Sequence, residues 1–165
     1  MNLGELLFRK ALLSDLSTLQ EIRKAAFTPI FDSFRSLLGD TIFDATQAPN
    51  IHSQKEHLLD IVQQDAPYET YVAVHQGTIV GFVSMKSDFK TKVGEIGLNA
   101  VHPDYEGHGV GTAMYNFILD KMKSLHMKIA VVSTGGDASH APALRAYEKA
   151  GFTKQLPSVW LCQEL

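Results

Sequence analysis

GEIGLNAVHPDYEGHGVGT, residues 94–112, is the stretch around which the rest of the chain can be interpreted. Its first part predicts a strand that a proline ends, and its last part opens an amphipathic run, to Leu125, that predicts a helix. Between them lie three glycines at alternate positions, Gly107, Gly109 and Gly111. Glycines before a helix let its unpaired backbone N–H groups face a ligand without obstruction by side chains. The stretch therefore predicts an anion site, most naturally for phosphate, with a tight turn as the alternative.

Two familiar phosphate-binding loops fit this segment poorly. A P-loop needs Gly-Lys-Ser/Thr at its end, whereas Gly111 is followed by Thr112 and Ala113. A dinucleotide-binding loop needs G-x-G-x-x-G and an acidic residue about 20 positions later, whereas this spacing is G-x-G-x-G and residues 129–132 read IAVV. A nucleotide-phosphate protein built on the glycines alone stays open as an alternative.

The loop resembles motif A of the GNAT superfamily of acyl-CoA N-acyltransferases, whose core pattern is Gln/Arg-x-x-Gly-x-Gly/Ala. This sequence has Glu106 where the family has Gln or Arg. The resemblance implies that the loop backbone holds the phosphates of CoA. The implied CoA-binding residues here are Glu106, Gly107, His108, Gly109, Val110, Gly111 and Thr112.

A second segment, residues 140–152, reads HAPALRAYEKAGF and resembles motif B of the same family. That motif is usually Asn-x-x-Ala-x-x-Leu-Tyr-x-x-x-Gly-Phe. Its alanine and tyrosine correspond to Ala143 and Tyr147, and Ala146 replaces its leucine. His140 replaces the asparagine that often contacts CoA in the family, and an imidazole can still donate a hydrogen bond.

The remaining sequence predicts helices on either side of a mixed sheet. A strand over residues 6–11 is followed by a helix that Ser14 caps and Pro29 ends or kinks, and then by an apolar cluster that Gly39 stops. Residues 40–50 predict a loop, and Ser53-Gln54-Lys55-Glu56 predicts a capping box that opens a second helix, closed by Pro67.

The sheet continues with strands over residues 69–75 and 78–86, joined by the tight turn Gln76-Gly77. Gly81 predicts a bulge or a close backbone approach. After the glycine loop and its helix, we expect a buried parallel strand over 128–133, a helix over 141–150 and a last strand within 152–165. The predicted class is α/β, with a mixed, mostly antiparallel central sheet flanked by helices, as the GNAT resemblance implies.

Composition limits the functions that the chain can have. Its 165 residues predict one domain, and the formal net charge of −3 gives no basic face for nucleic acid. No apolar run is long enough to cross a membrane, Met1–Glu5 lack a signal-peptide pattern, and Cys162 is the sole cysteine. These features predict a cytoplasmic protein without an intrachain disulfide.

The chemistry of acyl transfer points to two side chains. Tyr147 is the candidate acid that protonates the departing thiolate, because motif B implies the acid tyrosine at this position, and a core tyrosine is the alternative. Glu95 is the candidate base, since the histone-acetylating branch has a base glutamate in a similar run, and a solvated strand residue is the alternative. The resemblance also implies that the backbone of Asn99, Ala100 and Val101 binds the pantetheine arm.

The sequence gives little support for a metal or a covalent intermediate. His102, Asp104 and His108 match no standard ligand spacing. Cys162 lies in neither motif, and a free cysteine is more often a small buried apolar residue than a nucleophile. We therefore expect the acceptor to attack acetyl-CoA directly in a ternary complex.

The sequence thus predicts an acetyl-CoA-dependent N-acetyltransferase, and a non-catalytic acyl-CoA sensor is the alternative. The acceptor is expected to be an amine, on a small molecule or a protein, and the resemblance implies that residues 27–67 bind it, with core and surface roles as the alternative for their side chains. That region contains Phe27, Phe31, Phe34, Phe43, Asp32, Asp40 and Asp44. Dimers are common in this family.

Overall fold

The computed structural model describes residues 6–165, and Met1–Glu5, where no signal peptide was predicted, lie outside them. In the described part of the chain, five strands form one sheet in the order β1-β2-β3-β4-β5. The first four pair antiparallel and β5 pairs parallel to β4, so the predicted mixed sheet is confirmed. The strands are β1 (Leu7–Lys10), β2 (Glu69–His75), β3 (Thr78–Asp88), β4 (Val93–Val101) and β5 (Ile129–Val132).

The predicted hairpin between β2 and β3 is confirmed. Gln76 and Gly77 both have positive φ, 47° and 80°, which matches the twist of the flanking strands. Next to this turn the register of β2 and β3 shifts, opposite Gly81. A Cβ on Gly81 would lie 2.9 Å from the carbonyl oxygen of Ala100 in β4, so the predicted close backbone approach is present.

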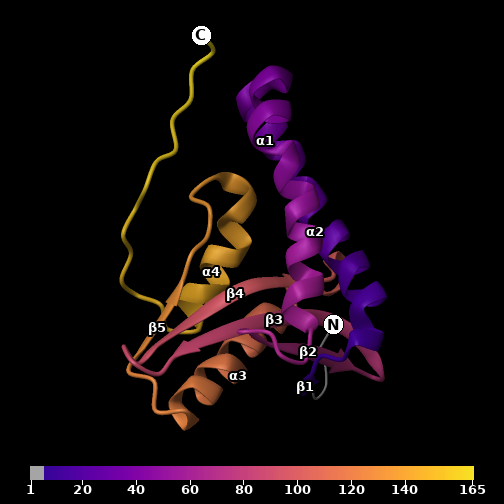
Figure 1. Cartoon of the computed structure of the whole chain (residues 1–165), viewed down its shortest axis with the longest axis vertical. Coiled ribbons are helices and arrows are strands. Elements are labelled where there is room, and N and C mark those ends of the chain that lie inside the picture. Colours follow the sequence, from indigo (N-terminus) through magenta and orange to yellow (C-terminus); the bar gives the residue numbers. More distant parts are fainter. Residues whose placement is uncertain (1–5) are drawn as a thin grey trace.

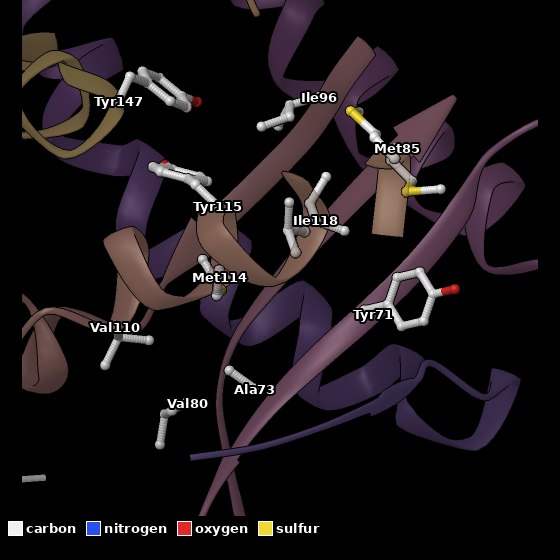
Figure 2. Close-up of a cluster of buried hydrophobic side chains, with 12 residues drawn as sticks. Tyr71, Ala73, Val80, Met85, Ile96, Val110, Met114, Tyr115, Ile118 and Tyr147 are labelled. Carbon is white, nitrogen blue, oxygen red and sulfur yellow. The ribbon is translucent and has the colours of Figure 1, made fainter. Parts of the chain in front are cut away.

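Helices cover both faces of the sheet (Figure 1). On one face, α3 (Val110–Ser124) buries Met114, Ile118 and Met122 against β2, β3 and β4. Figure 2 shows Met114 and Ile118 within this cluster. On the other face, α1 (Leu16–Thr46) and α2 (Ala48–Val62) bury Leu19, Ile22, Leu58 and Ile61. The remaining helices are η1 (Leu13–Asp15), η2 (Pro103–Tyr105), η3 (Ala138–His140) and α4 (Ala141–Lys149).

Helix α1 is longer than predicted. It passes through Pro29, although a proline removes one backbone hydrogen bond, and its local break lies instead at Gly39, with φ 75° and ψ 164°. The predicted loop over residues 40–50 is wrong, because helical structure resumes after Gly39. Arg35 spans the break by donating to the carboxylates of Asp40 and Asp44, a pairing that the apolar pattern does not reveal.

Two predicted helix starts are also wrong. Ser14 lies inside η1, and the N-cap of α1 is Asp15, whose carboxylate accepts from Arg9 and from the N–H of Leu12. Helix α2 begins at Ala48, before the predicted capping box. Ser53 therefore donates back to carbonyls of its own helix instead of capping it.

The C-terminal segment is the largest departure from the predicted elements. Residues 152–165 form no strand and run as an extended segment outside the sheet (Figure 1). Leu156, Val159 and Leu161 are exposed, and so is one face of β5, through Ile129 and Val131. The burial predicted for the strand over 128–133 is incomplete because β5 is an edge strand, and the strand predicted within 152–165 is wrong because that segment has no strand partner within the described residues. Pattern alone does not reveal which strand pairs with which.

Candidate functional site

A bulge in β4 opens the sheet. Val83 pairs with Asn99 and Met85 pairs with Ile96, so Ser84 alone faces two residues of β4, Gly97 and Leu98. The Ser84 hydroxyl donates to the carbonyl of Leu98 over 3.0 Å and holds this geometry.

Beyond the bulge, β4 and β5 separate. Their pairing ends at Ile96 with Val132, and β4 continues to Val101 without β5. His102 donates its N–H to Val80 of β3, so by strand alternation the backbone groups of Asn99 and Val101 face the side that β5 has left. The strands thus diverge before residues 99–101, and the divergence leaves the backbone groups of Asn99 and Val101 available to a ligand.

The glycine loop adopts the predicted backbone. Gly107 and Gly109 have positive φ, 74° and 85°, and Gly109 is the N-cap of α3. The first intrahelical bond joins the N–H of Ala113 to the carbonyl of Gly109, which leaves the N–H groups of the first turn directed out of the helix. A 15-residue helix also contributes partial positive charge at this end. The loop is therefore suited to an anion.

Glu106 differs from the other loop residues because it is acidic. Burial raises the pKa of its carboxyl, and the nearby His102 opposes that shift. The raised pKa favours the neutral form more than in a freely solvated glutamate, and this reduces repulsion of a neighbouring anion.

Tyr147 lies at the point where the strands diverge. It is 4 % exposed, and its ring stacks on that of Tyr115 from α3, with centroids 4.3 Å apart (Figure 2). The Asn99 amide Nδ2 donates to the Tyr147 hydroxyl over 3.0 Å and to the carbonyl of Gly97 over 2.9 Å. The Tyr115 hydroxyl donates to Asn99 Oδ1 over 2.8 Å, so the amide is fixed from both ends.

This network determines the state of the Tyr147 hydroxyl. Its oxygen accepts from Asn99, so its own O–H remains available to another acceptor. Burial raises the pKa of Tyr147, and contacts with Tyr115 and Asn99 oppose the shift without cancelling it. The hydroxyl is therefore protonated at neutral pH.

These elements border one cleft of about 930 Å³. Its first side, which we name the β4–α4 wall, consists of residues 95–101 of β4, the glycine loop and the first turn of α3, and residues 140–149. Its second side, the α1–α2 wall, consists of Ala26, Phe27, Pro29, Ile30, Gln54 and His57. The cleft is large enough for a cosubstrate and a small acceptor together.

Every side chain proposed from the sequence as catalytic borders this cleft. Tyr147 is buried in the β4–α4 wall, whereas Glu95 is exposed on β4, directly opposite Lys86 of β3. Both residues therefore border the cleft in different surroundings. A hydrogen-bond network encloses Tyr147, whereas Glu95 faces solvent.

His140 makes a contact that the sequence did not predict. Its Nδ1 lies 2.6 Å from Asp137 Oδ1, and the second oxygen of Asp137 accepts from the N–H and hydroxyl of Ser139. Burial raises the pKa of the Asp137 carboxyl, but these bonds outweigh that effect and the net shift is downward. The spacing Asp-x-x-His after two glycines was the available signal for this pair.

The carboxylates expected near the acceptor do not border the main cleft. Asp32 lines a smaller hollow of about 250 Å³, and Asp40 and Asp44 pair with Arg35. His102 and Asp104 form a local cap, in which His102 Nδ1 accepts from the N–H of Asp104. Across residues 6–165, no three His, Cys, Asp or Glu side chains gather as a metal site would require. No helix in the same part of the chain is long and apolar enough to span a bilayer.

Comparisons with known proteins agree with this architecture. The family model described as "Acetyltransferase (GNAT) family" matches residues 32–152. No curated protein matches the sequence significantly.

Solved structures resemble the fold at low sequence identity. The PaiA N-acetyltransferase of Thermoplasma acidophilum, in complex with coenzyme A, is 18 % identical, with a TM-score of 0.71 over 92 % of this chain and 91 % of that one. AAC(6′)-Iy in complex with the bisubstrate analogue CoA-S-monomethyl-acetylneamine is 13 % identical, with a TM-score of 0.63 over 98 % and 100 %. An aminoglycoside acetyltransferase from an uncultured soil metagenomic sample, in complex with sisomicin, is 16 % identical, with a TM-score of 0.61 over 97 % and 96 %.

Proposed function

The chain belongs to the acetyltransferase (GNAT) family, and from that membership we propose that it transfers an acetyl group from acetyl-CoA to a primary amine in a ternary complex. One observation carries the proposal: a buried tyrosine hydroxyl with a free proton lies where β4 and β5 diverge, in the same cleft as an anion-binding loop.

The β4–α4 wall is suited to CoA along its length. The N–H groups from His108 to Thr112 would hold the pyrophosphate, because they open α3 and carry its positive dipole end. Arg145 and Lys149 of α4 border the same part of the cleft and add positive charge for phosphate. The free backbone groups of Asn99 and Val101 would pair with the amides of the pantetheine arm.

Tyr147 would act as the general acid. When the amine attacks the thioester, a C–N bond forms and the C–S bond breaks, which leaves a thiolate. The Tyr147 O–H would donate its proton to that sulfur, while the N–H from Asn99 stabilises the phenolate that remains. The upward shift of the Tyr147 pKa keeps this hydroxyl protonated at neutral pH.

The acceptor would meet this centre from the α1–α2 wall. Among the described residues that line the cleft, this wall contributes four apolar side chains, an amide and an imidazole, and no carboxylate. The one carboxylate on the neighbouring strand surface, Glu95, faces Lys86 across the strands. A polycation gains little from such a surface, so an amine with an apolar body fits it better than an aminoglycoside does.

Direct attack agrees with the position of the sole thiol. Cys162 is exposed in the C-terminal segment and does not border the cleft, so the structure offers no cysteine to carry an acetyl group near Tyr147. Both substrates would then be bound at once.

The test is an acetyl-transfer assay with acetyl-CoA and a panel of primary amines that includes alkylamines, arylalkylamines, spermidine and sisomicin. Free thiol is measured together with the mass of the acetylated product. We expect turnover with at least one apolar monoamine and intersecting initial-velocity lines. CoA binding without turnover across the panel would contradict the enzyme assignment and favour the sensor, and parallel lines with an acetylated cysteine would contradict direct attack.

A further inference from the structure

A histidine–carboxylate pair is built into the loop before α4. His140 and Asp137 have side-chain exposures of only 16 % and 20 %, although both lie in a loop. The loop is shaped around the imidazole: a Cβ on Gly135 would collide with the ring, so a larger residue there would displace it. Both oxygens of Asp137 are engaged, one by His140 and the other by Ser139.

The pairing fixes which nitrogen of His140 can react. The lowered pKa of Asp137 keeps its carboxyl ionised at neutral pH, so Oδ1 can only accept. Nδ1 must then carry the ring hydrogen, and in the neutral ring Nε2 holds the lone pair. Within the described residues, all hydrogen-bond contacts of the His140 side chain use Nδ1, and its backbone N–H donates to the carbonyl of Asp137. Nε2 is therefore the atom of this pair that can take a proton.

His140 lies where α1 contacts the loop before α4. It borders the cleft as the N-cap of α4, the helix that carries Tyr147. From α1, the Phe34 ring stacks on the imidazole, with centroids 5.8 Å apart and planes at 27°. His140 is thus a cleft-lining side chain that contacts α1 and precedes the helix that carries Tyr147.

Few charged groups compete with Asp137 for influence on His140. The element packed on the ring, α1, contributes the uncharged Phe34. The other titratable groups that border the cleft are Glu95, Tyr105 and Tyr115, His57, Glu106, and Arg145, Tyr147 and Lys149. Asp137 is the one in direct contact with the imidazole.

We propose that His140, oriented by Asp137, is the general base that removes a proton from the acceptor ammonium. The inference rests on the proposed acetyl transfer. The ammonium gives one proton to Nε2, and the neutral amine forms the C–N bond. The C–S bond breaks, Tyr147 protonates the sulfur, and the second proton lost by nitrogen returns to the Tyr147 oxygen through water. His140 then releases its proton to solvent.

This assignment replaces Glu95 as the base. An imidazole ordinarily titrates near pH ~6.5 and a carboxyl near ~4.3, so an imidazole accepts a proton from an ammonium at a smaller free-energy cost. The carboxylate of Asp137 stabilises the imidazolium that forms, whereas Glu95 is exposed and faces Lys86.

The test compares His140→Asn with wild type on two acceptors. One is an alkylamine, charged near neutral pH; the other is trifluoroethylamine, whose electron-withdrawing group keeps it neutral there. We expect kcat/KM to fall ~10²-fold for the charged amine, as is typical for loss of a general base, and by less than about threefold for the neutral one. Asp137→Asn should lower kcat/KM for the charged amine by roughly tenfold. His52→Asn is the matched control, because it removes a histidine paired with a carboxylate, Glu56, outside the cleft.

The outcomes separate the base assignment from the function. Equal losses on both amines in His140→Asn would give the residue a structural role and overturn the proposal. Wild-type activity of His140→Asn on the charged amine would also overturn the proposal, and a ~10²-fold loss in Glu95→Gln on that amine alone would then make Glu95 the base. Absence of turnover by the wild-type protein on every amine would instead contradict the proposed function itself.

Discussion

The two walls of the cleft differ in what they present to a ligand. The β4–α4 wall presents backbone N–H groups, two cationic side chains and the buried hydroxyl of Tyr147. The α1–α2 wall presents apolar side chains around a single amide and imidazole. The first wall is fixed by hydrogen bonds and stacked rings, and the second by helix packing. The difference suggests that one wall binds a constant cosubstrate while the other sets the shape of the acceptor.

The largest effect is expected from Tyr147→Phe. The substitution keeps the ring and its stacking on Tyr115 but removes the proton donor, so the single-turnover transfer rate should fall ~10²–10⁴-fold while acetyl-CoA affinity changes little. Tyr71→Phe is the control, since it removes a buried hydroxyl bonded to Glu69, away from the cleft. A transfer rate in Tyr147→Phe within about threefold of wild type would show that Tyr147 has a structural role in the core and is not the general acid.

Gly109→Glu should weaken CoA binding without any change in the α1–α2 wall. Gly109 has φ 85°, so any side chain strains the backbone, and a carboxylate adds repulsion toward the phosphates. The Kd for CoA, measured by calorimetry, should rise by about tenfold or more beyond that of Gly109→Ala, which carries the strain without the charge. Equal Kd values for the two variants would place the phosphates elsewhere.

Asn99→Leu tests whether the hydrogen-bond network acts through Tyr147. Loss of the donated N–H leaves the phenolate less stable, and kcat should fall on the order of tenfold, corresponding to about 1.4 kcal/mol. In the Tyr147→Phe background the same change should have little further effect. Independent, multiplicative losses would show that Asn99 acts by another route.

The smallest effect is expected in the α1–α2 wall. Ile30→Ala removes part of an apolar surface and should raise the acceptor KM by about threefold, with kcat and the Kd for CoA unchanged. If this variant altered CoA affinity as much as acceptor KM, the division of the cleft into two walls would be wrong.

The same difference explains what the sequence could predict. The β4–α4 wall is encoded in two short segments, whose resemblance to motifs A and B of the GNAT family points to Gly109 and Tyr147. The α1–α2 wall comes from helices whose bounds were predicted wrongly. The helix continues through Pro29, and helical structure resumes after Gly39. Asp40 and Asp44, which the sequence places in the same region, do not line this wall and pair with Arg35 instead. The spacing of apolar residues and glycines predicts the local backbone, but it does not predict which side chains pair with one another.

The hydrogen-bond partners of individual side chains could not be predicted from the sequence either, because they are far apart along the chain. The tyrosine of motif B was identified by its position, but nothing in the spacing connects Asn99 with Tyr115 and Tyr147 across 48 residues. The strand predicted within residues 152–165 has the right residue types, yet strands form by pairing, and no described strand pairs with it.

A crystal structure of the complex with CoA tests the central claim most directly. The account predicts the pyrophosphate on the N–H groups from His108 to Thr112, the pantetheine arm along β4 beyond the bulge, and the CoA sulfur within hydrogen-bond reach of the Tyr147 hydroxyl. Phosphates bound away from the glycine loop, or a sulfur remote from Tyr147, would contradict it.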